Sequence, residues 1–305
     1  MTAESAVPFI RRMHLTTAAV RSTLRVVRPF HTFEGEGFPV RRPFPQPELP
    51  LVDPFLMVDQ VGPHVLGPGE AKGAPPHPHR GFETIQYVIE GAMEDIDSAG
   101  HRRVMHPGEV QWLTAGSGLV HLARPTPGLL ADGGPQHLLQ IWVNLPARLK
   151  STPPRVQYGS APGDIPRVVT EDGGAELTVI AGSTHGVRGP FETHTPVLVV
   201  HARLAAGGRA GFTVPAGHSA MLYVLSGTAA TPDARLPDGH LAILGRDAEH
   251  FTVEAPDDAA EVLVLAGEPL GEPVARTGPF VMNTAAEIRQ AQMDYQHGLM
   301  GHIDV

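Results

Sequence analysis

The hydrophobic pattern along the chain consists of short apolar runs that end in turn residues. In the first half, strand-like runs, most of them rich in valine, isoleucine, leucine and aromatic residues, cover 84–89, 93–96, 110–114 and 138–145. A second series covers 177–181, 197–204, 220–225, 241–244 and 261–266. Glycine, proline, aspartate or serine follows many of these runs, as is typical of strands joined by tight turns. The pattern predicts an all-β protein built from sandwiches or barrels.

The two series share a spacing that indicates an internal repeat. The run Tyr-Val-Ile-Glu-Gly ends at Gly91, and Gly108 follows it; the run Tyr-Val-Leu-Ser-Gly ends at Gly227, and Gly245 follows at a similar distance. A strand, a glycine turn, a returning strand and a second glycine turn therefore recur. We predict an N-terminal extension (1–22), a first barrel (23–146), a proline-rich linker (147–166), a second barrel (167–283), and a C-terminal helix with its tail (284–305).

One helix is expected, and it lies at the C-terminus. Thr284 and Glu287 have the spacing of a capping box. Ile288, Ala291 and Tyr295 follow at helical spacing, so one face of this helix can pack against a barrel.

Composition and charge exclude several classes of protein. The chain has 305 residues and no cysteine, which excludes disulfides, cysteine-ligated metals and a thiol nucleophile. Its net charge of −9 disfavours direct binding to nucleic acid. No apolar run is long enough to span a membrane, and the arginine-rich N-terminus lacks the apolar core of a secretory signal. We therefore expect a cytoplasmic protein that binds neither nucleic acid nor membrane.

The sequence PHPHRGFE at 76–83 is the strongest candidate for chemistry among the 17 histidines. If residues 77–83 form one extended strand, His77, His79 and Glu83 share a face. Two imidazoles spaced two residues apart on a strand can bind one metal ion. His121 follows a predicted hairpin and can return beside this pair. A histidine pair in a loop, without any ligand, is the alternative.

The order of these motifs resembles that of the pirin family, whose members are bicupins. The matching segments are PHPHRGFET at 76–84, GEVQWLTAG at 108–116, QIWVNLP at 140–146, LAGEPL at 265–270 and GPFVMNT at 278–284. The resemblance implies two stacked cupin barrels, with a metal site in the N-terminal barrel alone. It also implies Fe(II) as the metal, with nickel, manganese, copper or zinc as alternatives, and a monomeric protein.

The resemblance further implies which residues hold the metal, and this chain departs from the pattern at one of them. The three pirin histidines correspond to His77, His79 and His121, whereas the usual fourth ligand, a glutamate, corresponds to Ala123. An alanine methyl group cannot bind a metal. The site is then a three-histidine site, a site in which Glu83 replaces the missing ligand, or a weak or empty site. Glu83 is also a candidate general base, or a residue that orients His77 or His79.

Two functions follow from the resemblance. The first is a metal-dependent dioxygenase that cleaves quercetin or a similar flavonol, an aromatic small-molecule substrate. The second is a metal- and redox-dependent regulatory protein, of transcription or metabolism, that binds a protein partner and has little or no catalytic activity. We expect the dioxygenase, and turnover of quercetin by the Fe(II)-loaded protein distinguishes the two.

Overall fold

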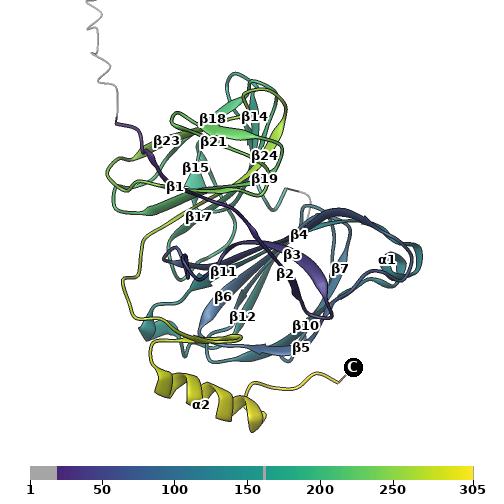
Figure 1. Cartoon of the computed structure of the whole chain (residues 1–305). Helices are drawn as coiled ribbons and strands as arrows, with labels where there is room; N and C mark the ends of the chain where they lie inside the picture. Colours follow the sequence, from purple (N-terminus) through teal and green to yellow (C-terminus); the bar gives the residue numbers. More distant parts are fainter. Residues whose placement is uncertain (1–18, 161–162, 305) are drawn as a thin grey trace, which may run out of the picture.

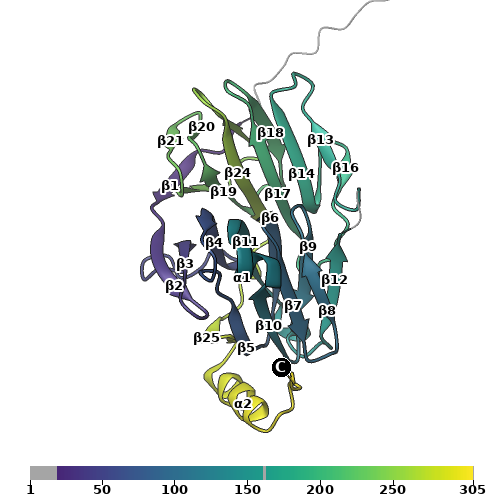
Figure 2. The same cartoon turned by 90° about the vertical axis from the view of Figure 1, so that its right-hand side faces the viewer.

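The expected all-β architecture with a C-terminal helix is confirmed by a computed structural model that describes residues 19–160 and 163–304. Two halves are stacked on each other, each made of a seven-stranded and a four-stranded sheet (Figures 1 and 2). Residues 1–18, which make up most of the predicted N-terminal extension, lie outside the described residues. No helix in the described part of the chain is long and apolar enough to cross a membrane.

The first half holds one sheet of seven antiparallel strands and one of four. The seven-stranded sheet has the order β12-β9-β6-β11-β4-β3-β2, with bounds Arg155–Gly159, Val110–Thr114, Phe82–Glu90, Gly134–Asn144, Phe55–Leu66, Phe38–Phe44 and Phe30–Glu34. The four-stranded sheet has the order β5-β10-β7-β8, with bounds Ala74–His79, Leu119–Pro125, Met93–Asp97 and Arg102–Met105. Two short helical segments connect strands, namely α1 (Pro127–Asp132) and the 3₁₀ turn η1 (Ala147–Leu149).

The second half repeats this arrangement, as the spacing of the glycine turns predicted. Its seven-stranded sheet has the order β1-β22-β19-β24-β17-β14-β13, with bounds Thr23–Val27, Leu241–Leu244, Ser219–Ser226, Ala260–Gly267, Val197–Leu204, Ala175–Ala181 and Arg167–Val169. Its four-stranded sheet has the order β18-β23-β20-β21, with bounds Arg209–Thr213, His250–Glu254, Ala229–Thr231 and Ala234–Leu236. A small hairpin, β15 (Ser183–Thr184) and β16 (Val187–Arg188), lies between β14 and β17 in the sequence.

The two seven-stranded sheets pack against each other and form the core between the halves. Ile85 and Tyr87 of β6 and Met221 and Tyr223 of β19 belong to this one buried apolar cluster. Intervening residues of β19, such as Leu222, point to the other side and fill the interior of the second half. Continuous apolar runs such as 220–225 arise because both faces of the strand are buried.

Three segments cross the boundaries that the sequence predicted. Strand β1, assigned to the first barrel, instead pairs with β22 of the second half. Strand β12, inside the predicted linker, pairs with β9 of the first half. The hairpin of β25 (Ala275–Thr277) and β26 (Phe280–Met282) follows the second half in sequence but lies on the first, where Phe280 is bridged to Arg80. We call residues 275–282 the strap; it leads into the terminal helix α2 (Ala285–Gln296).

Helix α2 begins with the capping box that the sequence indicated. The Thr284 hydroxyl accepts a hydrogen bond from the backbone N–H of Glu287, whose carboxylate accepts one from the backbone N–H of Thr284. Ile288 and Ala291 of the helix share a buried cluster with Val120 and Leu122 of β10. The helix therefore lies beneath β10, as Figure 1 shows.

Candidate metal centre

Three histidines meet inside the first half. His77 and His79 lie on β5, and His121 lies on β10, directly opposite His77 in the antiparallel register. One ring nitrogen from each can be chosen so that all three lie within 4.8 Å of one another. The ring centroids are 4.4–4.7 Å apart. The structure thus brings together the three histidines that the sequence singled out.

Strand alternation and helix packing explain why these rings point inward. Residues two apart on a strand share a face, which puts His77 and His79 on the same side of β5. On β10, Val120 and Leu122 face α2, so the intervening His121 faces the interior. The terminal helix therefore helps to fix the direction of His121, although it lies far from it in sequence.

Burial favours the neutral forms of His77 and His79 and leaves several ring nitrogens of the three histidines without partners. Burial and, to a smaller extent, the neighbouring His121 lower the pKa of His77 to about 4. Burial also holds the pKa of His79 well below its usual range. Both ring nitrogens of His79 and Nε2 of His121 are buried without a hydrogen-bond partner. Unpaired buried nitrogens are costly, whereas a divalent metal ion accepts their lone pairs, so the donor set fits such an ion.

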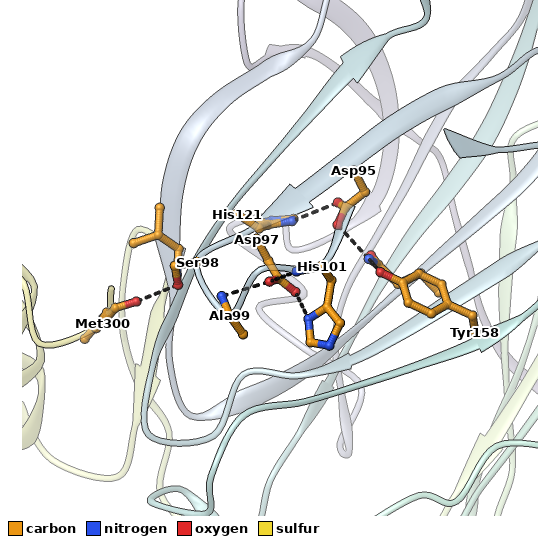
Figure 3. A network of polar contacts seen from close by, with 10 residues as sticks. Asp95, Asp97, Ser98, Ala99, His101, His121, Tyr158 and Met300 are labelled. Carbon is orange, nitrogen blue, oxygen red and sulfur yellow. Dashed lines mark hydrogen bonds and ion pairs between the residues drawn. The ribbon is translucent and has the colours of Figure 1, made fainter. Parts of the chain in front are cut away.

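Hydrogen bonds at Nδ1 of His77 and of His121 favour metal binding through Nε2. Nδ1 of His77 lies 2.8 Å from the carbonyl oxygen of Pro75, and Nδ1 of His121 lies 3.2 Å from Oδ2 of Asp95. In both cases Nδ1–H donates, which leaves the Nε2 lone pair free. Asp95 is itself held by Gln111, whose Nε2 donates to Oδ1 of Asp95 at 2.6 Å. Figure 3 shows His121 and Asp95 in this network.

Asp95 was not found from the sequence. It lies in the run Met-Glu-Asp-Ile-Asp of β7, where two aspartates, Asp95 and Asp97, are buried in a strand. Asp97 accepts hydrogen bonds from the backbone N–H groups of Ala99 and His101 and from Nδ1 of His101, which fixes the turn after β7. Three acids in this five-residue strand between apolar runs were a signal that some of these carboxylates are buried and bind neighbouring groups.

A cleft of about 570 Å³ opens beside the histidines. Its lining includes His77, His79, Trp142 and, from the strap, Arg276. This volume lies within the range of about 300–1,000 Å³ found for small-molecule sites. The second half, by contrast, is filled by apolar side chains. The cleft and the histidines therefore mark the first half as the place where a small molecule can bind.

Ala123 lies next to the histidines, but it offers no ligand atom. It lines a smaller cavity of about 60 Å³ together with His77 and His121. On β7, Asp95 is its direct neighbour in the strand register. The position therefore lies close to the centre, and the resemblance places the usual fourth ligand there.

Glu83 does not join the three histidines, which corrects the expectation that it could replace the missing ligand or act as the base there. The chain turns at Gly81, where φ is +86°, so β5 and β6 are separate strands in different sheets. Phe82 packs on His79, and the next residue, Glu83, points to the opposite face of β6. There its Oε1 accepts a hydrogen bond of 2.7 Å from the Thr114 hydroxyl. Burial raises the pKa of Glu83 to about 7.

Comparison with known proteins relates both halves of the chain to described families. The family model described as Pirin matches residues 37–143, and that of the Pirin C-terminal cupin domain matches residues 199–301. A Pseudomonas aeruginosa protein, provisionally named a quercetin 2,3-dioxygenase, is 41% identical over 266 residues, which are 87% of this chain and 92% of the relative.

Two solved structures share the fold. The crystal structure of a quercetin 2,3-dioxygenase from Acinetobacter baumannii has a TM-score of 0.88 and 36% identity, and the match covers 94% of this chain and all of that one. A bacterial pirin from Escherichia coli, solved with nickel(II), has a TM-score of 0.62 and 19% identity, covering 80% of this chain and 99% of that one. At this lower identity the likeness concerns the fold.

Proposed function

This chain belongs to the pirin family, and we propose that it is a dioxygenase that acts on quercetin or flavonol-like substrates at a single divalent metal ion. One observation carries the proposal: three imidazoles converge beside a cleft and keep buried nitrogens without partners. The 36% identity to a quercetin 2,3-dioxygenase supports the assigned activity.

In this proposal His77, His79 and His121 hold the ion, with Fe(II) as the first candidate. The nickel in the Escherichia coli pirin makes nickel the nearest alternative. When bound, a divalent ion supplies a Lewis-acid centre that favours the deprotonated form of an oxygen ligand. Three neutral imidazoles leave its charge at +2, which strengthens that preference.

The remaining residues of the site bind and shield the substrate. Asp95 fixes the ring of His121 and its proton on Nδ1. The rings of Trp142 and Phe82 pack at a tilt with centroids 4.2 Å apart, and both contact His79, so they form an apolar wall beside the histidines. Such a wall suits an aromatic substrate and keeps water from one side of the site.

Metal content and turnover test the proposal. We expect the wild-type protein to bind one equivalent of Fe(II) or another divalent ion, and a His79→Ala variant to lose it. A His106→Ala variant, which changes an exposed histidine, is the matched control. Aerobic addition of quercetin to the Fe(II)-loaded protein should consume quercetin and dioxygen in equal amounts. A loaded protein without turnover would contradict the enzyme and favour the regulatory function expected as the alternative; that function and the cytoplasmic location stay predictions.

A further inference from the structure

The strap is fixed firmly on the first half, above the cleft. The backbone N–H of Val281 donates to the carbonyl oxygen of Arg80 at 3.0 Å. The buried Nζ of Lys150 donates to the carbonyl oxygens of Gly81 and Val281, at 2.8 and 3.0 Å, and so joins the strap to the turn beside the metal centre. Any side chain that the strap extends into the cleft is therefore held at a defined place.

Arg276 is such a side chain. Its guanidinium carbon lies 4.6 Å from the centroid of the Trp142 ring, and that ring lies 5.2 Å from His79. Its other polar contacts are to the carbonyl oxygen of Leu56 at 3.3 Å and the sulfur of Met57 at 3.9 Å. Neither of these groups is charged, and Arg276 forms no ion pair within residues 19–160 and 163–304. The Trp142 ring therefore lies between the guanidinium of Arg276 and His79 of the metal centre.

The acidic side chains of the cleft do not form an ion pair with Arg276. Glu34 and Asp59 both bind Arg42, whose Nη2 lies 2.5 Å from Oε1 of Glu34 and 2.6 Å from Oδ2 of Asp59. The two carboxylates and the two guanidiniums, Arg42 and Arg276, cancel in charge. Because the three histidines are neutral ligands, a bound divalent ion adds two positive charges, and the buried carboxylate of Asp95, 3.2 Å from Nδ1 of His121, offsets one of them.

We propose that Arg276 binds a carboxylate of the substrate, so that the site selects aromatic or enolic chelators that carry a carboxylate over neutral ones. This inference rests on the proposed function, and it names carboxylate-bearing chelators as the preferred substrates of that site; quercetin, which has no carboxylate, serves as a turnover probe. The metal-binding oxygens of such a ligand reach the histidines, while its carboxylate pairs with the guanidinium that lies on Trp142. The deprotonated chelating hydroxyl of such a ligand offsets the charge that remains at the metal centre, and its carboxylate gives Arg276 the ion-pair partner that Glu34 and Asp59, which bind Arg42, do not supply. A guanidinium is also the cation best shaped to bind a carboxylate through two parallel hydrogen bonds.

A matched pair of probes tests this, namely 3,4-dihydroxybenzoate and catechol, which share the chelating diol and differ in the carboxylate. Their dissociation constants are measured by calorimetry on zinc(II)-loaded protein, because zinc has no redox chemistry with the diol. We expect wild-type protein to bind 3,4-dihydroxybenzoate at least about tenfold more tightly than catechol, the gain of one charge-assisted contact. Equal binding of the two probes by wild-type protein would overturn the proposal.

Variants assign the preference to Arg276. In Arg276→Gln, which keeps a polar side chain near Leu56, the preference should fall to about twofold or less, by loss of affinity for 3,4-dihydroxybenzoate. Arg209→Gln, a change of an exposed arginine in the second half, should keep the full preference. A preference that survives in Arg276→Gln would also overturn the proposal.

Metal titration before any probe is added separates this inference from the proposed function. Loss of a positive charge should leave zinc affinity of Arg276→Gln equal to or tighter than that of wild-type protein. If wild-type protein takes up no metal ion, the proposed function fails. The same probe pair on that metal-free protein still decides the role of Arg276, because its pairing with a carboxylate needs no metal.

Discussion

Nδ1 of His121 lies 3.2 Å from Oδ2 of Asp95, and both side chains are almost fully buried. The carboxylate therefore fixes the proton of His121 on Nδ1 and aims Nε2 at the other two histidines. Such carboxylate–histidine pairs raise the affinity of metal sites, and their loss costs roughly 10- to 100-fold. The contact links β7 to the metal centre.

We predict that Asp95→Asn weakens metal binding by roughly 10-fold or more. The amide carries no negative charge, and it cannot accept hydrogen bonds from both His121 and Gln111 through its two terminal atoms. Competition with a chelator of known affinity measures the change. Asp172→Asn, at an exposed position of the second half, should leave the metal affinity unchanged. Unchanged metal affinity in a folded Asp95→Asn protein would show that the pair is merely structural.

A second prediction concerns Ala123→Glu. Ala123 lines a cavity with His77 and His121, and a glutamate there would add an anionic ligand but would lie opposite Asp95 in the strand register. We expect the metal-free variant to be less stable than wild type, because like charges face each other across neighbouring strands. We expect metal binding to be tighter by about tenfold or more, because the ion gains an oppositely charged ligand.

The Ala123→Gln variant is the control for size. It fills the cavity as glutamate does but adds no charge, so it should not tighten metal binding. Thermal unfolding with and without metal, together with the chelator competition, measures both effects. Equal metal affinity of the glutamate and glutamine variants would mean that the side chain at 123 does not reach the ion.

Much of the fold was predictable from the sequence because its patterns are local. Strand runs ending in turn residues predicted the two β-rich halves, and the Thr284 capping box predicted helix α2. The pair His77 and His79 was predictable for the same reason, since alternation within one strand sets their shared face. His121 was placed beside them by its position after a hairpin and by the resemblance to the pirin family.

What could not be predicted depends on breaks in a strand and on contacts between distant segments. The predicted face of Glu83 was wrong because the alternation of side chains was continued through Gly81. The chain turns there, so the alternation along β6 does not follow from that along β5. Arg276 lies 134 residues beyond Trp142, and only the return of the strap to the first half brings them together. Strand β1 likewise pairs with a segment more than 200 residues away. No periodicity carries such information.

Gly81 gives a third prediction, because it lets the strap approach. A Cβ atom at Gly81 would stand 2.0 Å from the carbonyl oxygen of Val281, and φ at this residue is +86°. We predict that Gly81→Ala displaces the strap and lowers the free energy of unfolding by about 2 kcal/mol beyond the cost of the backbone strain alone. It should also weaken binding of a ligand that uses Arg276.

Gly217→Ala separates the cost of backbone strain from the cost of the close contact with the strap. Gly217 has the same φ of +86°, but a Cβ there would meet nothing within 4 Å. Its loss of stability therefore reports the strain of the conformation without a close contact. Chemical denaturation of both variants measures the difference. Equal destabilisation would show that the strap yields without cost at Gly81.

The last prediction concerns pH and Glu83. Burial raises its pKa from 4.5 to about 7, so the folded protein binds a proton here that the unfolded chain releases between these values. Stability from this group is therefore greatest below about pH 4.5 and falls as the pH rises to about 7, by on the order of 3 kcal/mol. Glu83→Gln lacks this loss, so its stability relative to wild type should increase across the same interval. His77 and His137, whose pKa values burial lowers to about 4, act in the opposite direction in both proteins and cancel in the difference. Denaturation of both proteins at several pH values gives this difference, and a flat difference between pH 4.5 and 7 would show that Glu83 is ionised throughout.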